Sequence, residues 1–285
     1  MNKGYIYLIF AALSYASMGV LVKALSVDLS PFSQVFLRLC VSGVLTLAFI
    51  LYKKKSLLLK SKSDYLLILF MGVVGYGAQI VVFTFSLYHT TIGNALFIFS
   101  AYPIITALLA WGFLKEKLIK RHSIALILLS CILFLLFDPT HINKYLLGNT
   151  LAFLTCVTFA IYVICSRVLT KRGNSPEAIT VWSIWLGVLT SGIPAFLFEH
   201  VTLQISPQTY IFILVFGLLN AAAWNLVNKG FATVKAGVGT MILLLEPVLG
   251  SFLGLLFFHE IPTMTFIIGA IIMITAIYIA TFSLE

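Results

Sequence analysis

Glu246 lies near the middle of a long apolar run, residues 237–258, and no other acidic residue of the chain lies as deep in such a run. An ionisable group inside a bilayer costs about 3 kcal/mol or more, so each one is a functional candidate. Pro247 removes a backbone donor, which frees a carbonyl one turn earlier. Three glycines on about the same helix face predict open space beside the carboxyl: Gly239, Gly250 and Gly254. Glu246 can then bind a substrate ammonium or carry a coupling proton, and the alternative is a neutral acid that hydrogen-bonds a neighbouring helix.

A second group of candidates forms a polar stripe, because Asn220, Trp224 and Asn228 recur at every fourth residue of another apolar run. At 100° per residue they cover about 80° of one helix face, and Asn225 lies about 60° beyond Asn228. Lipid offers an amide no hydrogen-bond partner, so the stripe must face other helices or an aqueous cavity. Interhelical hydrogen bonding and substrate binding are both open interpretations.

Aromatic and amide side chains in the remaining runs extend the candidate site. Tyr76, Gln79 and Phe83 share one helix face, and Tyr162 belongs to a stripe of hydroxyl side chains. Ser and Thr often hydrogen-bond their own helix backbone, which is the simpler explanation of that stripe. Tyr102, like the deep glutamate, precedes a proline. The predicted substrate-binding residues are Glu246, Gln79, Tyr76, Trp224, Asn225, Asn228, Asn220, Tyr102 and Tyr162.

Charged residues near the ends of the runs have simpler explanations. Lys23 and Arg38 lie in the outer thirds of two runs with Asp28 between them, which predicts snorkelling and an ion pair. The rarer alternative is a cationic lining for a substrate carboxylate. Glu116 and Glu260 stand at helix ends on opposite sides of the membrane, so we expect each to cap or anchor the next helix, with a gating ion pair as the weaker alternative.

The composition excludes a soluble protein, because 61% of the residues are hydrophobic and only 9% are charged. Soluble domains are about 25% charged, and disordered chains are richer still in charge. A spanning helix needs about 20 apolar residues. The apolar runs predict an all-α membrane protein with ten transmembrane helices: 4–26, 32–52, 64–88, 93–114, 123–137, 145–168, 178–198, 208–229, 237–258 and 264–282.

The positive charges predict the orientation of these helices. With the N-terminus inside, most of the 18 Lys and Arg residues fall in cytoplasmic segments, only Lys144 falls in an outer loop, and Lys23 and Arg38 lie within runs. The positive-inside rule therefore places both termini in the cytoplasm. The net charge of +9 follows from this topology, so we expect no nucleic-acid partner. The cytoplasmic residues are Lys3, Lys53, Lys54, Lys55, Lys60, Lys62, Lys115, Lys117, Lys120, Arg121, Arg167, Lys171, Arg172, Lys229 and Lys235.

No motif in the sequence points to a cofactor, a metal or an enzyme. The five histidines are scattered, whereas metal sites need clustered ligands. The chain has neither a Gly-x-x-x-x-Gly-Lys-Ser/Thr phosphate loop nor a Gly-x-Ser-x-Gly nucleophile elbow. The four cysteines lie inside apolar runs, as small core residues do. We therefore expect no catalytic residue, no cofactor and no metal site.

The chain also repeats itself at an offset of 144 residues. Three residues of the first half match three of the second in the same order: Gly93, Pro103 and Glu116 match Gly237, Pro247 and Glu260. With a gap of one residue, Gly72 matches Gly217 and Gln79 matches Trp224. Each half holds five runs, and five is odd, so the second half must enter the membrane upside down. Inverted repeats characterise secondary transporters, whose substrate site lies near the midplane between the halves; a static bundle built by duplication is the alternative.

The mid-helix Pro103 and the piece Lys115-Glu116-Lys117, with their copies around Glu246-Pro247 and His259-Glu260, resemble the EamA family of the drug/metabolite transporter superfamily. The resemblance covers nearly the whole chain and implies two domains, each an EamA-like five-helix repeat: residues 1–138 and 145–285. The first half departs from the family pattern at Tyr102, where the second half keeps a glutamate. A symmetric role for that carboxylate is therefore not expected.

The resemblance and the inverted repeat predict a secondary transporter that moves a small metabolite by alternating access. An amino acid or a related amphipathic compound is the expected substrate, export the expected direction, and a bacterial-type plasma or inner membrane the expected location. The substrate and the lipid bilayer are the expected partners, a proton is a candidate coupling ion, and the protein is a monomer or a homodimer. The alternatives are a lipid flippase or scramblase, a passive channel, and, more weakly, a membrane-embedded lipid-modifying enzyme.

Overall fold

The computed structural model describes residues 3–90, 95, 98–116, 123–128, 145–258 and 264–282, and every regular element in these ranges is a helix. The π-helical segment η1 joins two α-helices into one continuous rod. The elements in chain order are α1 (Lys3–Leu25), α2 (Pro31–Tyr52), α3 (Lys62–Phe70), η1 (Met71–Ala78), α4 (Gln79–His89), α6 (Tyr102–Leu114), α8 (Leu146–Lys171), α9 (Pro176–Phe198), α10 (Pro207–Thr233), α11 (Ala236–Leu243), α12 (Leu245–Phe258) and α13 (Met264–Phe282).

Many of these helices suit a lipid environment. Large apolar side chains such as Trp111, Phe196 and Leu218 are exposed, which matches a surface that faces hydrocarbon. The predicted run 123–137 is described only at 123–128, which is helical, and its remainder lies outside the described residues. Within the described part of the chain, five stretches are long and apolar enough to cross a membrane: Pro31–Tyr52, Lys62–His89, Leu146–Lys171, Pro176–Phe198 and Pro207–Thr233.

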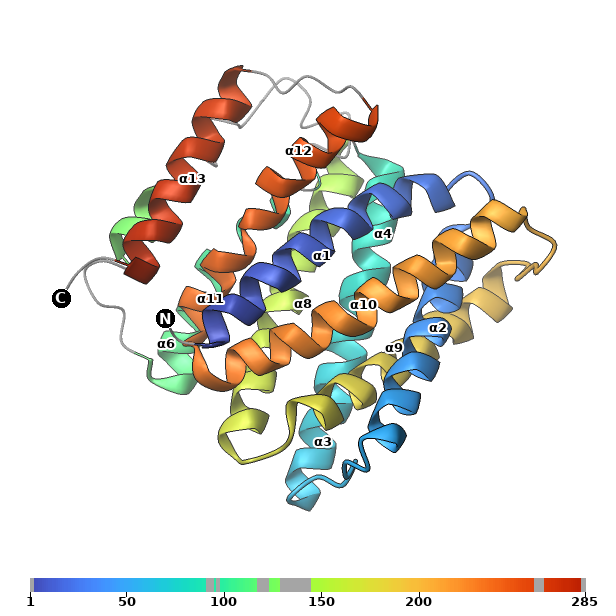
Figure 1. Ribbon diagram of the computed structural model, residues 1–285, viewed down its shortest axis with the longest axis horizontal. Helices are drawn as coiled ribbons and strands as arrows, with labels where there is room; N and C mark the ends of the chain where they lie inside the picture. The colour runs from blue at the N-terminus through green and yellow to red at the C-terminus, as the bar shows by residue number, and fades with distance from the viewer. Residues whose placement is uncertain are drawn as a thin grey trace.

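Helix ends that the charge pattern assigns to one side of the membrane contact one another. At the predicted cytoplasmic end, Lys55 pairs with Glu177 at the start of α9, at 2.5 Å between Nζ and Oε1. At the predicted outer end, Glu199, which follows α9, accepts hydrogen bonds from the hydroxyls of Ser30 and Ser33 at the start of α2. The start of α1 and the end of α13 also lie toward the same end of the bundle (Figure 1).

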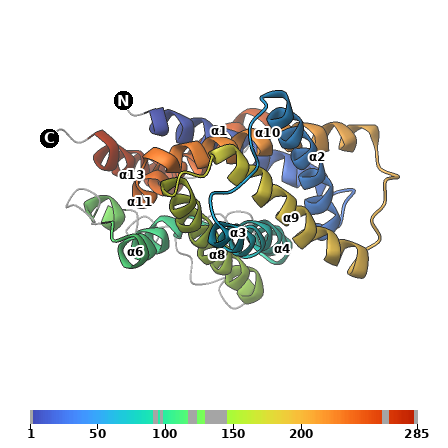
Figure 2. The same cartoon turned by 90° about the horizontal axis from the view of Figure 1, so that it is seen from below.

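Packing between the two halves follows the sequence repeat. Helix α1 packs along α10, and its repeat counterpart α8 packs along α4, the counterpart of α10. Likewise α2 packs on α10 while α9 packs on η1, and α1 packs on α12 while α8 packs on α6. Figure 2 shows α1 and α10 on one side of the molecule and α3, α4, α6 and α8 on the other. Each of these three contacts between the halves thus has a partner with the halves exchanged.

Two glycines form close contacts between the halves that are related to each other by the sequence repeat. A Cβ atom on Gly72 of η1 would collide with the side chain of Leu186 on α9. A Cβ atom on Gly217 of α10 would collide with the side chain of Val41 on α2. Gly72 and Val41 both lie 145 residues before their counterparts, Gly217 and Leu186. The two halves therefore present the same small-residue contact to each other in both directions.

The structure corrects the prediction of one continuous helix over 237–258. Helix α11 ends at Leu243 and α12 begins at Leu245, with the break at Leu244. Proline has no N–H, and its ring crowds the carbonyl four residues earlier, so Pro247 cannot continue the hydrogen bonding of α11. The break therefore sets Glu246 in the first turn of a new helix.

The matching run of the first half is interrupted at the equivalent place. Helix α6 begins at Tyr102, with Pro103 at its second position. The carbonyl of Phe99, which Pro103 leaves without its usual donor, accepts a hydrogen bond from the thiol of Cys156 at 3.4 Å. Both halves thus carry a proline-dependent helix start, and α11, which precedes the second of them, packs on α6.

We expect Gly72→Ala and Gly217→Ala to destabilise the protein by similar amounts, about 1–3 kcal/mol each, because each new methyl overpacks an equivalent contact. Thermal unfolding in detergent micelles measures the effect. Gly112→Ala is the matched control, since nothing lies within 4 Å of a Cβ atom at that position. An unchanged midpoint in Gly72→Ala and Gly217→Ala would contradict the tight contact.

Candidate functional site

Trp224 of α10 lies at the centre of a group of aromatic side chains that come from both halves of the chain. Its ring centroid is 4.6 Å from those of Tyr76 and Tyr162, 5.7 Å from that of Tyr15 and 6.1 Å from that of Phe159. Tyr102 joins through Phe159, at 4.9 Å. These residues are called the aromatic cluster below: Tyr15, Tyr76, Tyr102, Phe159, Tyr162 and Trp224. Four of the predicted site residues are therefore brought together.

Asn220 ties one side of the aromatic cluster together. Its amide nitrogen donates to the hydroxyls of Ser42 and Tyr76, at 3.0 and 3.1 Å, and its carbonyl oxygen accepts from the indole N–H of Trp224 at 3.1 Å. The side chain is buried. Helices α2 and α10 and the π-helical segment are thereby joined at one amide, which fixes the orientation of two aromatic rings.

Asn228, two turns further along α10, does the same for α8 and α9. Its carbonyl oxygen accepts from Tyr162 at 2.9 Å and from Ser166 at 2.6 Å, and its nitrogen donates to Thr180 at 2.9 Å. Both asparagines of the predicted stripe therefore face protein. Their hydrogen bonds are made within the bundle, as the interhelical interpretation requires.

The other two amides in the prediction lie apart from this network. Asn225 is half-buried and has no side-chain hydrogen bond to the described residues. Gln79 is buried at the start of α4, and within the described ranges its Oε1 has no hydrogen-bond donor. The structure does not bring Gln79 or Asn225 into contact with Trp224 through any ring or hydrogen bond among the described residues.

Glu246 borders the aromatic cluster from the start of α12. It is half-buried, and its carboxyl interacts electrostatically with the hydroxyls of Tyr15 and Tyr102. It forms no hydrogen bond or ion pair with the described residues. The Tyr15 hydroxyl, buried beside it, also lacks a hydrogen-bond partner in the described part of the chain. An acid and a phenol of the bundle interior are thus each left without a hydrogen-bond partner among the described residues.

The glycines predicted to open space beside Glu246 behave differently from one another. A Cβ atom on Gly239 would come within 3.0 Å of the Phe231 ring, so α11 is packed closely there and the prediction is wrong at this residue. Nothing lies within 4 Å of a Cβ atom on Gly250, so the space exists on that part of the face. The surroundings of Gly254 lie outside those described.

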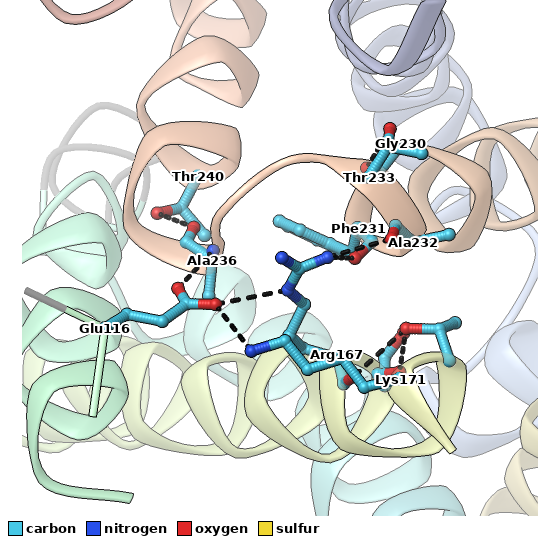
Figure 3. Close-up of polar contacts among 11 residues, drawn as sticks. Glu116, Arg167, Lys171, Gly230, Phe231, Ala232, Thr233, Ala236 and Thr240 are labelled. Atoms are coloured by element: carbon cyan, nitrogen blue, oxygen red, sulfur yellow. Dashed lines mark hydrogen bonds and ion pairs between the residues drawn. The ribbon is translucent and has the colours of Figure 1, made fainter. Parts of the chain in front are cut away.

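A second polar cluster joins both halves at the predicted cytoplasmic end (Figure 3). Glu116, just after α6, accepts through Oε1 from Arg167 Nε and Lys171 Nζ of α8, both at 3.2 Å. Its Oε2 accepts from the backbone N–H of Ala236 at the start of α11, at 3.1 Å. This arrangement is called the Glu116 cluster below. Glu116 does cap a helix, but the capped helix is α11 of the other half and not the next helix along the chain, as was expected.

Arg167 extends the Glu116 cluster to the end of α10. Its Nη1 donates to the carbonyl oxygens of Phe231 and Ala232, at 2.6 and 2.9 Å. The last carbonyls of a helix have no partner within the helix, and a cation satisfies both their hydrogen bonding and their negative dipole. The end of α10, the start of α11 and the end of α6 are therefore held by one ion pair.

The prediction that the Arg38 side chain snorkels and pairs with Asp28 is wrong. The carboxylate of Asp28 accepts from Ser206 and Thr209 at the start of α10. Arg38 is instead 3% exposed, and it donates to Gln34 and Thr84. The side chain of Lys23 lies outside the described residues.

Three contributors to these sites were not predicted: Tyr15, Ser42 and Arg167. Tyr15 and Ser42 carry no spacing signal of their own among many apolar neighbours. The offset of 144 residues does contain a signal for Arg167, because it matches Lys23 just as Glu116 matches Glu260. Repeat positions that are charged in both halves would have identified that residue.

Comparison with known proteins gives one family and several distant relatives. The model of the EamA-like transporter family matches residues 2–137 and again residues 146–282. The solute carrier family 35 member G1 of Mus musculus is 23% identical over 96% of this chain and 76% of its own length. The uncharacterized transporter YoaV of Bacillus subtilis is 23% identical over 99% of this chain and 98% of its own length.

An uncharacterized transporter of Clostridium kluyveri is 22% identical over 96% of this chain and 91% of its own. A solved crystal structure superimposes with a TM-score of 0.82 at 17% identity, covering 98% of this chain and 97% of that one. At this identity the likeness concerns the fold alone.

We expect Asn228→Ala to lower the stability by about 2 kcal/mol, because it removes three interhelical hydrogen bonds worth about 0.6 kcal/mol each in a membrane. Asn225→Ala is the matched control on the same helix, and we expect a change within about 0.5 kcal/mol. Unfolding of both variants in the same detergent measures the difference. Equal losses would mean that Asn228 does not hold α8 and α9 to α10.

Proposed function

This chain is a multi-pass membrane protein of the EamA-like transporter family, and we propose that it is a secondary transporter for a small amphipathic metabolite. In this proposal two inverted five-helix repeats, residues 1–138 and 145–285, make ten membrane-spanning helices with both termini in the cytoplasm. The halves alternate between states open to either side of a plasma membrane. An amino acid or a related compound is the substrate, and export is the direction.

The observation that carries the proposal is the aromatic cluster, which both halves build at their interface. Tyr15, Tyr76 and Tyr102 come from the first half, and Phe159, Tyr162 and Trp224 from the second. Substrate sites of inverted-repeat transporters lie between the halves, at helices that are interrupted there. The helix starts at Tyr102 and Leu245 meet this requirement, since both lie beside the cluster.

The exchanged packing of the halves supports alternating access. Because three contacts between the halves each have a counterpart with the halves swapped, a movement that opens one side has an equivalent that opens the other. Two states related in this way have similar energies, and a ligand with different affinities for them can shift the population between them.

Glu246 is assigned the polar contact with the substrate or the coupling proton. It is the described acid that keeps a free carboxyl next to the cluster, and the exposed N–H groups of the first turn of α12 attract negative charge to the same place. The tyrosines and Trp224 then offer flat apolar surfaces to the remainder of the substrate. Asn220 and Asn228 act by holding these rings in position.

The Glu116 cluster closes the bundle at the predicted cytoplasmic end. It binds the first half to α8, α10 and α11 of the second half, so these contacts must break before the site opens to that side. The conformation described here is then closed toward the cytoplasm.

Counterflow in proteoliposomes tests the function. Vesicles loaded with a pool of unlabelled amino acids, nucleosides or polyamines receive a trace of one labelled compound outside, at pH 5.5 and 8. Trans-stimulated uptake of one class is expected for a carrier, whereas a channel gives flux that does not respond to the compound inside. No exchange by folded protein, together with movement of labelled lipid between leaflets, would overturn the proposal in favour of a lipid substrate.

We expect Glu246→Gln to keep the fold and to lower counterflow at least about tenfold, or to abolish its dependence on pH, because the amide carries neither the charge nor the proton. Glu199→Gln is the matched control, a carboxyl-to-amide change at the far end of α9 that should leave the pH profile unchanged. Wild-type rates at both pH values in Glu246→Gln would remove this residue from the mechanism.

We expect Glu116→Gln to loosen the cytoplasmic end, because it weakens an ion pair and a helix cap together. Hydrogen exchange at the start of α11 should become about tenfold faster, the equivalent of about 1.4 kcal/mol. Glu177→Gln, which removes a different ion pair at the same end, is the control and should not alter α11. Unchanged exchange in Glu116→Gln would show that the cluster does not hold this end closed.

A further inference from the structure

Arg38 is a buried cation that has no acidic partner in the part of the chain that the structure describes. Its guanidinium lies inside the bundle on α2, where the side chain is 3% exposed. Nη1 donates to Gln34 Oε1 at 3.2 Å and Nη2 to Thr84 Oγ1 at 3.0 Å, and both acceptors are neutral. Nε has no acceptor in the described ranges. A buried charge that lacks a counterion is costly, so its retention calls for an explanation.

The other described acids cannot supply the missing partner, because five of the six are engaged elsewhere. Asp28 binds Ser206 and Thr209, Asp64 binds Arg172 and Asn174, Glu116 binds Arg167, Glu177 binds Lys55, and Glu199 binds Ser30 and Ser33. The sixth is Glu246. In the part of the chain that the structure describes, the cation Arg38 and the anion Glu246 are thus each left unpaired within the membrane.

Both unpaired groups border the aromatic cluster, at different members of it. Arg38 interacts electrostatically with Tyr76, and its backbone carbonyl accepts from Ser42, whose hydroxyl in turn binds Asn220. Glu246 interacts with Tyr15 and Tyr102. Members of the aromatic cluster therefore interact with a positive group and with a negative group that both lack a charged partner among the described residues.

The neighbours of Arg38 come from both halves, so a movement between the halves can give a ligand access to it. The residues that hold the guanidinium, Gln34 and Thr84, belong to the first half. The ring that covers it belongs to the second half, since the guanidinium carbon lies 4.5 Å from the centroid of Phe216 on α10. Relative movement of the halves would uncover Arg38 while leaving it held in place.

We propose that Arg38 binds a carboxylate of the transported molecule, so that the substrate class is carboxylic acids with an apolar body. The guanidinium presents a fork of N–H groups that matches a carboxylate, and such charge-assisted hydrogen bonds are about twice as strong as neutral ones. The substrate carboxylate then supplies both an acceptor for the free Nε donor of Arg38 and the missing counterion. This inference rests on the proposed transport function and assigns the chemistry of its site.

A matched series of small molecules tests the assignment without changing the protein. Leucine and phenylalanine are compared with their amides and with the amines that lack the carboxylate, at equal concentrations. The readouts are the thermal midpoint of purified protein and competition for counterflow of whichever compound the pooled screen finds. Carboxylates should bind about tenfold or more tightly than their amides. Equal effects of acids and amides on wild-type protein would overturn the proposal.

Two substitutions locate the preference at Arg38. In Arg38→Gln the advantage of carboxylates over amides should disappear, and in Arg38→Lys, which keeps the charge but not the fork, part of it should remain. Arg172→Gln makes the same chemical change at a half-exposed ion pair and should keep the full preference. A carboxylate preference that survives Arg38→Gln would also overturn the proposal.

The outcomes separate this inference from the transport function. If the wild-type protein exchanges compounds but ignores the carboxylate, the carrier stands and only the role of Arg38 falls. If it neither binds nor exchanges any member of the panel, the transport proposal falls and the inference falls with it.

Discussion

A bilayer offers no hydrogen bonds, and this constraint decides how the whole bundle is arranged. The amides of Asn220 and Asn228 lie on one face of α10, and only other helices can satisfy them. They find Ser42 and Tyr76 on one side and Tyr162, Ser166 and Thr180 on the other. Helix α10 is therefore drawn into the interface between the halves, and the aromatic rings that these amides hold come to lie there too.

The same constraint makes the interrupted helices informative. A proline inside a membrane helix removes a backbone hydrogen bond, which is tolerated where protein can supply another partner. The thiol of Cys156 does so for the carbonyl that Pro103 frees. Where the second half repeats the interruption, the first turn of α12 carries Glu246 in place of Tyr102. The two halves are thus alike in shape and unlike in charge at their meeting point.

A difference in charge between two halves of similar shape would suit a carrier. In the proposed mechanism the symmetric frame of the two halves allows two conformations of comparable energy, whereas the asymmetric groups decide what is carried. The described acids at the ends of the helices have partners, as Glu116 has in the Glu116 cluster, so they hold helix ends together. Within the described residues Arg38 and Glu246 lie in the interior without a charged partner, and the proposal assigns that partner to the ligand.

Much of this could be read from the sequence, because hydrophobic runs, the distribution of Lys and Arg, and a repeat at fixed offset are all local or periodic signals. They predict the helical membrane class, the family and the inward-facing stripe on α10, and the family model and the helix packing agree with them. The stripe could be recognised because its polar residues recur on one helix face, and polar residues in a membrane helix turn away from lipid.

Which side chains meet across helices was decided by the tertiary structure alone. The ring of Tyr15 contacts that of Trp224, and Arg167 forms an ion pair with Glu116. Asp28 accepts a hydrogen bond from Thr209 at the start of α10 and does not pair with Arg38. All these contacts join segments that lie far apart in the chain. Gln79 and Asn225 carry the same amide group as Asn220 and Asn228, but among the described residues they do not join the hydrogen bonds around Trp224. Spacing along a helix determines the face on which a residue lies, but the partner opposite that face depends on how the helices pack, and no periodic pattern in the sequence contains that information.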